Sequence, residues 1–427
     1  MTKITIPVFA VWLALCAYFV FETFHDHKCD YTMRYGEIMA LRQGVNPFDV
    51  WNGEIILEGF KPVNVHHDLD GRLADTNYGR HLRETGTEPD GIGIQGYPPW
   101  QYMYLLPFTY LPLKTGAAVF SCAIMLTAAL VLFALFKMCG PFAGNGGGAF
   151  AAAVFGVIAA STPLLKVFQF GQWSVLVLLS IVCMAMCLEK NRDYLAGLCW
   201  AVAMIKPHFA VLFIIPLVMS RKWKTIATAV AACVLLSIPP ALMCKTSPVD
   251  MIIQVFLFGA PIFGGNGFIP WPAFAIISHE IGSPAFPKAV MALGLLFGTV
   301  ICVFTSLEMK SRPWAQRICA VTVISLAWTY LHISDFVLYA LPVAFILACA
   351  FGGERAEGEH TASRLRLAAV TSFVVFLNCS TFETPREIFE NALGLRSGIL
   401  LMPLNAARCL LIPASWILVL RTLRKIK

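Results

Sequence analysis

The sequence predicts an all-α polytopic membrane protein. Three observations support this fold class: 58% of the 427 residues are hydrophobic, only 13% are charged, and the mean hydropathy is +0.70. Ordinary soluble domains carry about 25% charged residues, and a soluble chain of this length needs a polar shell around two or three domains. The composition therefore excludes a soluble enzyme, a disordered chain and a disulfide-stapled secreted module.

The charge distribution separates one water-facing module from the rest of the chain. Residues 22–99 contain 7 Lys/Arg and 13 Asp/Glu, a net charge of −6, whereas the whole chain has a net charge of +7. The basic excess outside this window fits short cytoplasmic turns, which are rich in Lys and Arg in membrane proteins. No basic stripe with interleaved aromatic residues is present, so we expect no nucleic-acid partner.

Apolar runs of membrane-spanning length divide the chain, since a bilayer-crossing helix needs about 20 apolar residues. The first run, residues 4–21, follows Lys3 and lacks a small-residue cleavage site, so we expect an uncleaved signal anchor with a cytoplasmic N-terminus. A large extracytoplasmic loop, residues 22–114, comes next. It ends in an interfacial or re-entrant segment from Tyr97 to Leu113, because Trp and Tyr prefer the headgroup level.

Two membrane bundles follow, residues 115–243 and 288–420, separated by a second extracytoplasmic loop at residues 244–287 that is rich in Pro and Gly. Basic residues mark the ends that face the cytoplasm, as does the basic tail at 421–427. The chain is thus a single domain, residues 1–427, of about 12 hydrophobic helices, with about 10–13 possible. The apolar runs are 115–136, 149–163, 172–188, 194–219, 225–243, 288–307, 318–332, 336–351, 367–380 and 398–420.

One apolar run breaks the alternation between cytoplasmic and outer ends that the basic residues mark. Residues 194–219 carry cytoplasmic signals at both ends, and Lys206-Pro207 interrupts the middle. A proline inside a helix removes a hydrogen bond and ends or kinks the helix. We therefore expect two short helices, 194–206 and 207–219, each about 20 Å long, that dip toward the outer face and return.

Polar residues near membrane level collect on the outer side of this topology. Ionisable groups at this depth are costly and therefore suggest function, and their recurrence in separate segments predicts one shared site. Alternatives stay open for single residues: Asp30 as a solvated charge, Lys206 reaching the headgroups, and Gln172 or His332 satisfying a helix end. The residues concerned are Asp30, Gln172, Lys206, His208, Asn266, His332 and Asp335.

Short motifs in the same order resemble glycosyltransferase family 87, from residue 1 to about residue 340. They are Asp30-Tyr31 with Tyr35 and Ala40, Gly44-Val-Asn46-Pro47-Phe48-Asp49, Tyr97-Pro98-Pro99, Gly171-Gln172 and Ile205-Lys206-Pro207-His208. Three positions depart from the family pattern. Phe48 replaces the usual Tyr, Ser174 stands where Asn often follows Gly-Gln-x, and Asn266 lies in only a loose match to Gly-Asn-x-Ser.

The resemblance implies a GT-C type membrane glycosyltransferase with an Asp of the first outer loop at the reaction centre. It further implies a polyprenyl-phosphate sugar, commonly mannose, as the donor co-substrate, with no other cofactor. The expected partners are the lipid bilayer, this donor and a lipid-linked or cell-envelope glycan acceptor. The expected location is a bacterial inner membrane, with multiple spans and an active site on the extracytoplasmic side.

Transfer with inversion assigns roles to the outer polar residues. Asp30 is the expected general base beside the acceptor oxygen. Cations that stabilise the departing phosphate are expected at Lys206, His208 and His332. A monophosphate leaves without a divalent ion, so we expect no metal. The expected substrate-binding residues are Tyr35, Asn46, Tyr97, Gln172, Asn266 and Asp335.

Two other functions fit a multi-pass chain. A transporter or flippase of lipid-linked sugars favours paired broken helices and internal repeats, whereas this chain has one clear break and no convincing repeat. A glycan polymerase or ligase would favour an arginine-rich outer loop, whereas residues 22–99 are acidic.

Overall fold

The computed structural model describes most of the chain outside both termini. The described residues are 30–51, 53–62, 91–94, 97–144, 147–159, 161–254, 285–328 and 333–351, with isolated positions at 18, 76, 77, 80, 81, 84, 417, 419–421, 423 and 424. The predicted first span except Tyr18, the run 367–380, most of the run 398–420, most of the second loop and the residues Asn266 and His332 lie outside this set.

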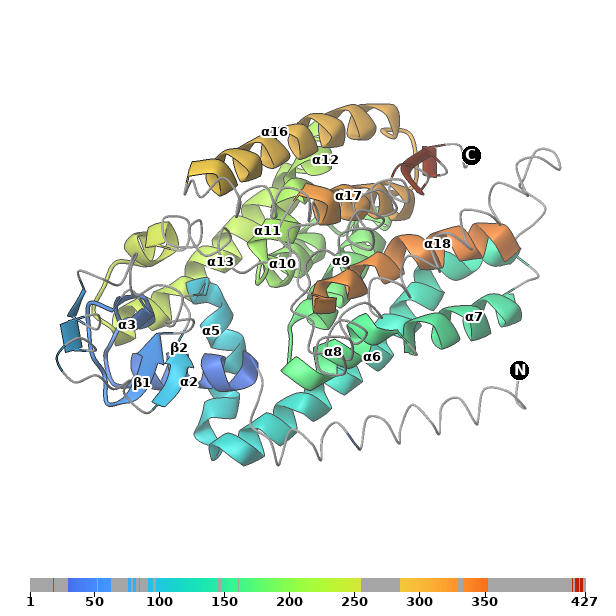
Figure 1. The fold of residues 1–427 in the computed structure, drawn as a ribbon. Coiled ribbons are helices and arrows are strands. Elements are labelled where there is room, and N and C mark those ends of the chain that lie inside the picture. The colour runs from blue at the N-terminus through green and yellow to red at the C-terminus, as the bar shows by residue number, and fades with distance from the viewer. Residues whose placement is uncertain are drawn as a thin grey trace, which may run out of the picture.

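The first loop folds into a module at one end of the molecule (Figure 1). Its helices are α2 (Asp30–Arg42), α3 (Pro47–Trp51), α5 (Pro99–Leu105) and the 3-10 helix η2 (Leu106–Tyr110). It also contains a short two-stranded parallel sheet of β1 (Gly59–Pro62) and β2 (Gly91–Ile94), in which Gly59 pairs with Gly91, whereas the rest of the described fold is helical as predicted. These four-residue strands are too short for hydrophobic alternation to reveal them.

The module has its own small apolar core. Phe48, Val50, Trp51 and Phe60 are buried together with Ala40 of α2. Helix α2 packs closely on the sheet at Gly36, where an added Cβ would lie 2.7 Å from the Ile92 side chain. Helix α2, which carries Asp30, is thereby fixed against the sheet.

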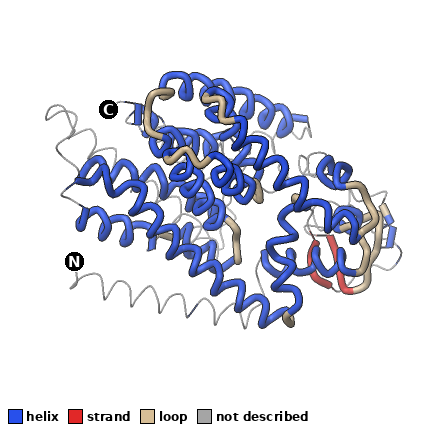
Figure 2. Tube along the Cα trace, turned by 180° about the vertical axis from the view of Figure 1, so that it is seen from behind, coloured by secondary structure: helices blue, strands red, loops and turns tan. Residues whose placement is uncertain are grey.

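The remaining described helices form a bundle beside this module, and Figure 2 shows the same arrangement from behind, with both strands at the module end. Helices α6, α7 and α18 run side by side in Figure 1, consistent with their mutual contacts. The bounds are α6 (Leu113–Ala143), α7 (Gly147–Ala159), α8 (Thr162–Phe170), α9 (Ser174–Glu189), α10 (Asp193–Ala203), α11 (Pro207–Ala210), η4 (Val211–Phe213), α12 (Ile214–Met219), α13 (Trp223–Met243), α16 (Ala285–Glu308), α17 (Trp314–Trp328), η5 (Ile333–Tyr339) and α18 (Ala340–Phe351).

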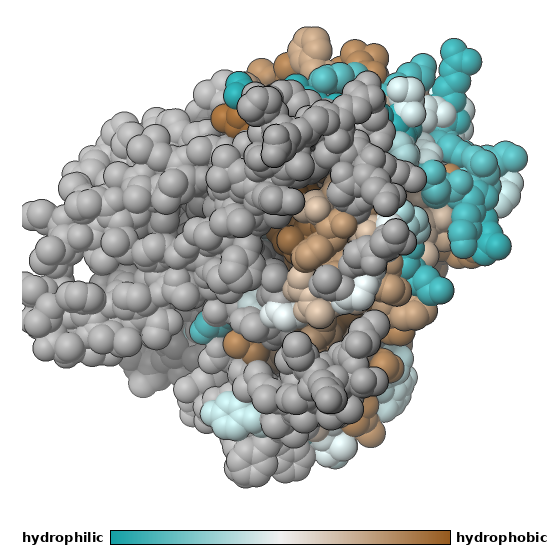
Figure 3. Space-filling model, turned by 90° about the vertical axis from the view of Figure 1, so that its right-hand side faces the viewer, coloured by the Kyte–Doolittle hydropathy of each residue, from teal (hydrophilic) through white to brown (hydrophobic). Residues whose placement is uncertain are grey.

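Two of the described helices, α6 and α13, are long and apolar enough to cross a membrane. Large apolar side chains on them face outward: Leu126 and Phe133 of α6 are 63% and 60% exposed, and Leu235 of α13 is 64% exposed. Figure 3 shows hydrophobic residues next to a hydrophilic margin on one face of the molecule. Exposed apolar surface on such helices is what a lipid solvent requires, so the fold is that of a mostly helical membrane protein.

Candidate active site

The turn between α8 and α9 presents Gln172. Ser161 caps α8 by accepting a hydrogen bond from the Leu164 amide, and the helix ends at Gly171, whose φ is +65°. Glycine adopts this left-handed conformation without steric cost. The chain then turns, and α9 begins at Ser174. Gln172 and Ser174 therefore lie at the same end of the bundle, next to the first loop.

The break between α10 and α12 presents Lys206. Helix α10 ends at Ala203, and Pro207 occupies the first turn of α11, where a missing amide hydrogen is tolerated. Lys206 between them has φ −115° and ψ 80°, outside helical geometry. The indole of Trp100 from α5 donates to the Met204 carbonyl at 3.0 Å. The break is thus tied to the module that holds α2.

A buried network surrounds the Lys206 ammonium. Its Nζ donates to Gln172 Oε1 at 2.9 Å, to Ser174 Oγ at 3.0 Å and to Asp335 Oδ1 of η5 at 2.5 Å. The Ser174 hydroxyl in turn donates to Asp335 Oδ1 at 2.6 Å. Lys206 is 2% exposed and Asp335 is fully buried. Because an ammonium has three N–H donors, a direct contact with a phosphate requires one of these partners to be given up.

Asp30 joins this network from the first loop. The Nε2 group of Gln172 donates to Asp30 Oδ2, across 142 positions of sequence. Asp30 is the first described residue of α2 and is partly exposed, unlike the buried Lys206 and Asp335. The structure thus brings together Asp30, Gln172, Lys206 and Asp335, with the one partly exposed carboxylate at the end of the chain of contacts.

A second buried charge cluster lies one helical turn further along α2. Arg34 Nη1 donates to Glu37 Oε1 at 2.5 Å, and both side chains are buried. The guanidinium carbon lies 3.1 Å from the centroid of the Tyr97 ring, so the cation stacks on the aromatic face. This cluster anchors the segment before α5 onto α2, close to Asp30.

Burial and the neighbouring charges together shift the pKa values of Arg34 and Tyr97. Burial alone lowers the pKa of Arg34, but the nearby Glu37 carboxylate, with Tyr97 and Asp30, outweighs it and raises that pKa. Burial also raises the pKa of the Tyr97 hydroxyl, and the carboxylates of Asp30 and Glu37 add to this effect against the opposing influence of Arg34. Tyr97 therefore keeps its proton and remains able to donate a hydrogen bond.

Three further predicted residues have their described contacts elsewhere. The Tyr35 hydroxyl donates to the Leu111 carbonyl at 3.5 Å, on the face of α2 that packs toward η2. The amide of Asn46 donates to Gln254 at 3.0 Å and orders the turn into α3. The His208 ring lies 4.0 Å from that of Phe209. These contacts hold Tyr35 against Leu111 and Asn46 against Gln254, and the assignment of both residues to substrate binding stays a prediction.

The residues that sequence reasoning missed are Ser174, Arg34 and Glu37. Ser174 counted as a departure from the family pattern, yet its hydroxyl contacts both Lys206 and Asp335. Arg34 lies four residues after Asp30, a spacing that places two side chains on one helix face, so helical periodicity carried a usable signal. The partner of Arg34 is three residues further on, and its burial comes only from the tertiary fold.

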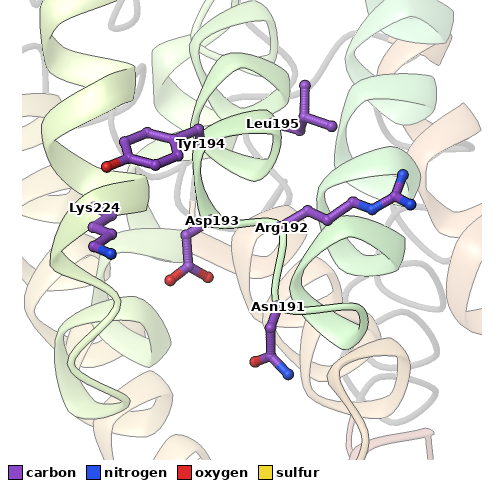
Figure 4. A pocket seen from close by; sticks show the side chains of 6 residues that line it. All are labelled: Asn191, Arg192, Asp193, Tyr194, Leu195 and Lys224. Atoms are coloured by element: carbon purple, nitrogen blue, oxygen red, sulfur yellow. The ribbon is translucent and has the colours of Figure 1, made fainter.

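A pocket at the opposite end of the bundle is separate from this network. Helix α10 starts there at Asp193, about 16 Å from its other end at 1.5 Å per residue, and Asp193 lies 2.9 Å from Lys222. The end carries basic residues and is the one that the charge rule places in the cytoplasm. Figure 4 shows the lining side chains Asn191, Arg192, Asp193, Tyr194, Leu195 and Lys224.

Comparison with known proteins agrees with the motifs. The family model of glycosyltransferase family 87 matches residues 96–381, about two thirds of the chain, and this region contains Gln172, Lys206 and Asp335 but not Asp30. No curated protein matches the chain, and no solved structure matches it. Since the family model covers well over half of the sequence, this membrane protein belongs to glycosyltransferase family 87.

Proposed function

We propose that the protein transfers a hexose, mannose by resemblance, from a polyprenyl-phosphate sugar to a lipid-linked or cell-envelope glycan acceptor. The proposed location is a bacterial inner membrane with the reaction on the extracytoplasmic face. The observation that carries this proposal is the hydrogen bond from Gln172 to Asp30, which holds a partly exposed carboxylate against a buried polar network. Glycosyltransferase activity comes from the family; donor, sugar, acceptor and face are the proposal.

The proposed reaction is a single displacement with inversion. The acceptor hydroxyl oxygen attacks the anomeric carbon, its proton passes to the Asp30 carboxylate, and the bond from the anomeric carbon to the phosphate oxygen breaks. The bonding electron pair leaves with the polyprenyl phosphate. A positioned carboxylate base contributes about 10²–10⁴-fold to such a step, and Asp30 suits this role because it is partly exposed and Gln172 donates to one of its two oxygens.

The charge balance bears on how the phosphate is bound. Asp30, Glu37 and Asp335 are three carboxylates, whereas Arg34 and Lys206 are two cations, so this set carries one net negative charge. Added cations are therefore needed near a phosphate leaving group. We propose His208, which α11 carries two residues after Lys206, and His332, three residues before Asp335, for this task. Tyr97 is proposed to donate a hydrogen bond to the sugar.

The test is a transfer assay on the purified full-length protein in lipid nanodiscs, with a panel of labelled polyprenyl-phosphate sugars and glycolipid acceptors. Asp30→Asn is expected to lower kcat by about 10²–10⁴-fold, because Asn accepts the Gln172 hydrogen bond but takes up no proton at working pH. Asp193→Asn, a partly exposed carboxylate at the opposite end, is the matched control and should leave transfer unchanged.

Two outcomes would contradict the proposal. Undiminished transfer by Asp30→Asn removes the assigned base. Movement of the lipid-linked sugar across the bilayer without any glycosidic product indicates a flippase instead. Product stereochemistry, read by NMR of the new linkage, checks inversion separately.

A further inference from the structure

We infer, given the transfer reaction proposed above, that Lys206 is a positioning residue: it orients the Gln172 amide, and this amide holds the Asp30 carboxylate in its working geometry. Lys206 was expected to bind the donor phosphate directly. In the structure, the Lys206 ammonium instead bonds to groups of the protein itself.

The first step concerns the ammonium itself. Three acceptors lie at hydrogen-bond distance from Nζ, namely Gln172 Oε1, Ser174 Oγ and Asp335 Oδ1. They match the three N–H groups of a lysine ammonium. The side chain is 3% exposed, and the Asp335 carboxylate at 2.5 Å neutralises its charge. Such a lysine has no spare N–H donor for a phosphate, and its ion pair with Asp335 carries no net charge that would attract one.

The second step concerns the orientation of Gln172. Its carboxamide has one accepting end and one donating end. Lys206 can only donate, so it selects the Oε1 end, and the Nε2 end then points at Asp30. Rotating the amide by half a turn would place NH₂ against the ammonium and a carbonyl oxygen against a carboxylate, and both contacts would be repulsive. The lysine thereby decides which group faces the base.

The third step concerns the reach of this chain of contacts. Asp335 lies in η5, Lys206 in the α10–α11 break, Gln172 after α8 and Asp30 in α2. Sequence separations are 129, 34 and 142 positions for the successive bonds. Because these hydrogen bonds run in series from Asp335 to Asp30, the geometry of the Asp30 carboxylate depends on a lysine that it does not touch.

The experiment compares two neutralised Lys–Asp pairs in the transfer assay. Lys206→Met alone would leave Asp335 as a buried charge without its cation and would risk misfolding. The double variant Lys206→Met/Asp335→Asn removes both charges. Lys222→Met/Asp193→Asn is the matched control, since it removes a Lys–Asp pair at the opposite end of α10. A second probe, Gln172→Met, keeps the side-chain length and deletes the amide.

The expected result is a fall in kcat of about 10²-fold or more for Lys206→Met/Asp335→Asn and for Gln172→Met. The KM for the polyprenyl-phosphate sugar should stay within about threefold of the wild-type value, because a misplaced base slows the step without weakening donor binding. The yield of folded protein should match that of the control double variant, which should keep wild-type kcat and KM.

Three results would overturn the inference. A rise in the donor KM with little change in kcat makes Lys206 a phosphate ligand. Full activity of the Lys206→Met/Asp335→Asn variant makes the ion pair purely structural. Full activity of Gln172→Met removes the link to Asp30. Failure of the proposed function is distinct from all three, since the wild-type protein itself would then show no transfer.

Discussion

Replacing Arg34 by Met tests how the first loop is held around Asp30. Arg34 is 1% exposed and its partner Glu37 is 0% exposed, with 2.5 Å between Nη1 and Oε1. Removing one partner of a buried ion pair typically costs about 3–5 kcal/mol, since the other charge stays in a medium that solvates it poorly. Stacking on the Tyr97 ring is lost as well and is worth about 0.5–2 kcal/mol. We therefore expect the free energy of unfolding to fall by about 3.5–7 kcal/mol.

The assay is denaturant unfolding of the purified protein in detergent, followed by tryptophan fluorescence. Glu308→Gln is the control, because it breaks the ion pair with Arg424, whose side chains are 52% and 32% exposed; exposed pairs contribute no more than about 1 kcal/mol. The double variant Arg34→Met/Glu37→Leu should recover most of the loss, since apolar residues often replace a buried pair without penalty.

The pH dependence gives a second readout of the same variant. A buried carboxylate that has lost its cation escapes the penalty by taking up a proton. The deficit of Arg34→Met relative to wild type should therefore be smaller at pH 5 than at pH 8. The reasoning is refuted if Arg34→Met costs no more than Glu308→Gln, or if the double variant is as unstable as the single one.

Two glycines give further predictions. Gly197→Ala should lower the unfolding temperature, since the new Cβ would lie 2.6 Å from the Thr225 carbonyl oxygen and push α10 off α13; Gly140→Ala, whose nearest neighbour is 4.0 Å away, should be neutral or slightly stabilising, and equal effects would contradict the packing argument. Gly171→Ala should cost about 1–2 kcal/mol, because φ is +65° there, and should slow transfer by displacing Gln172; wild-type kcat in this variant would show that the turn geometry is unimportant.

Several features of the fold followed from local sequence alone. Hydropathy indicated the helices that became α6 and α13, and Pro207 indicated the interruption of the helix at Lys206, because a proline acts on its own turn whatever surrounds it. The separate nine-residue α8 was missed. Its hydrophobic residues continue the pattern of the preceding run, although Gly171 was a signal for its end.

The candidate site, too, was only partly predictable from the sequence. The predicted topology singled out Asp30, Gln172, Lys206 and Asp335, among other polar residues, as lying at one level, since each is costly near a membrane and stands out against apolar neighbours. Order along the chain says nothing about which partner satisfies which donor. The Tyr35 hydroxyl, for example, donates to the Leu111 carbonyl, a contact that the sequence did not indicate, and its role in substrate binding stays a prediction.

Local chemistry thus specified where helices start, stop and break, because backbone conformation responds to the nearest few residues. Only the folded arrangement decided that three acceptors, two around the start of α9 and one from η5, saturate one lysine, and that Arg34 and Glu37 leave water together. Hydrogen-bond partners and burial depend on distances in space between segments, which are 34, 129 and 142 residues apart along the chain for the bonds that link Asp30, Gln172, Lys206 and Asp335. No pattern within a single stretch of chain encodes those distances.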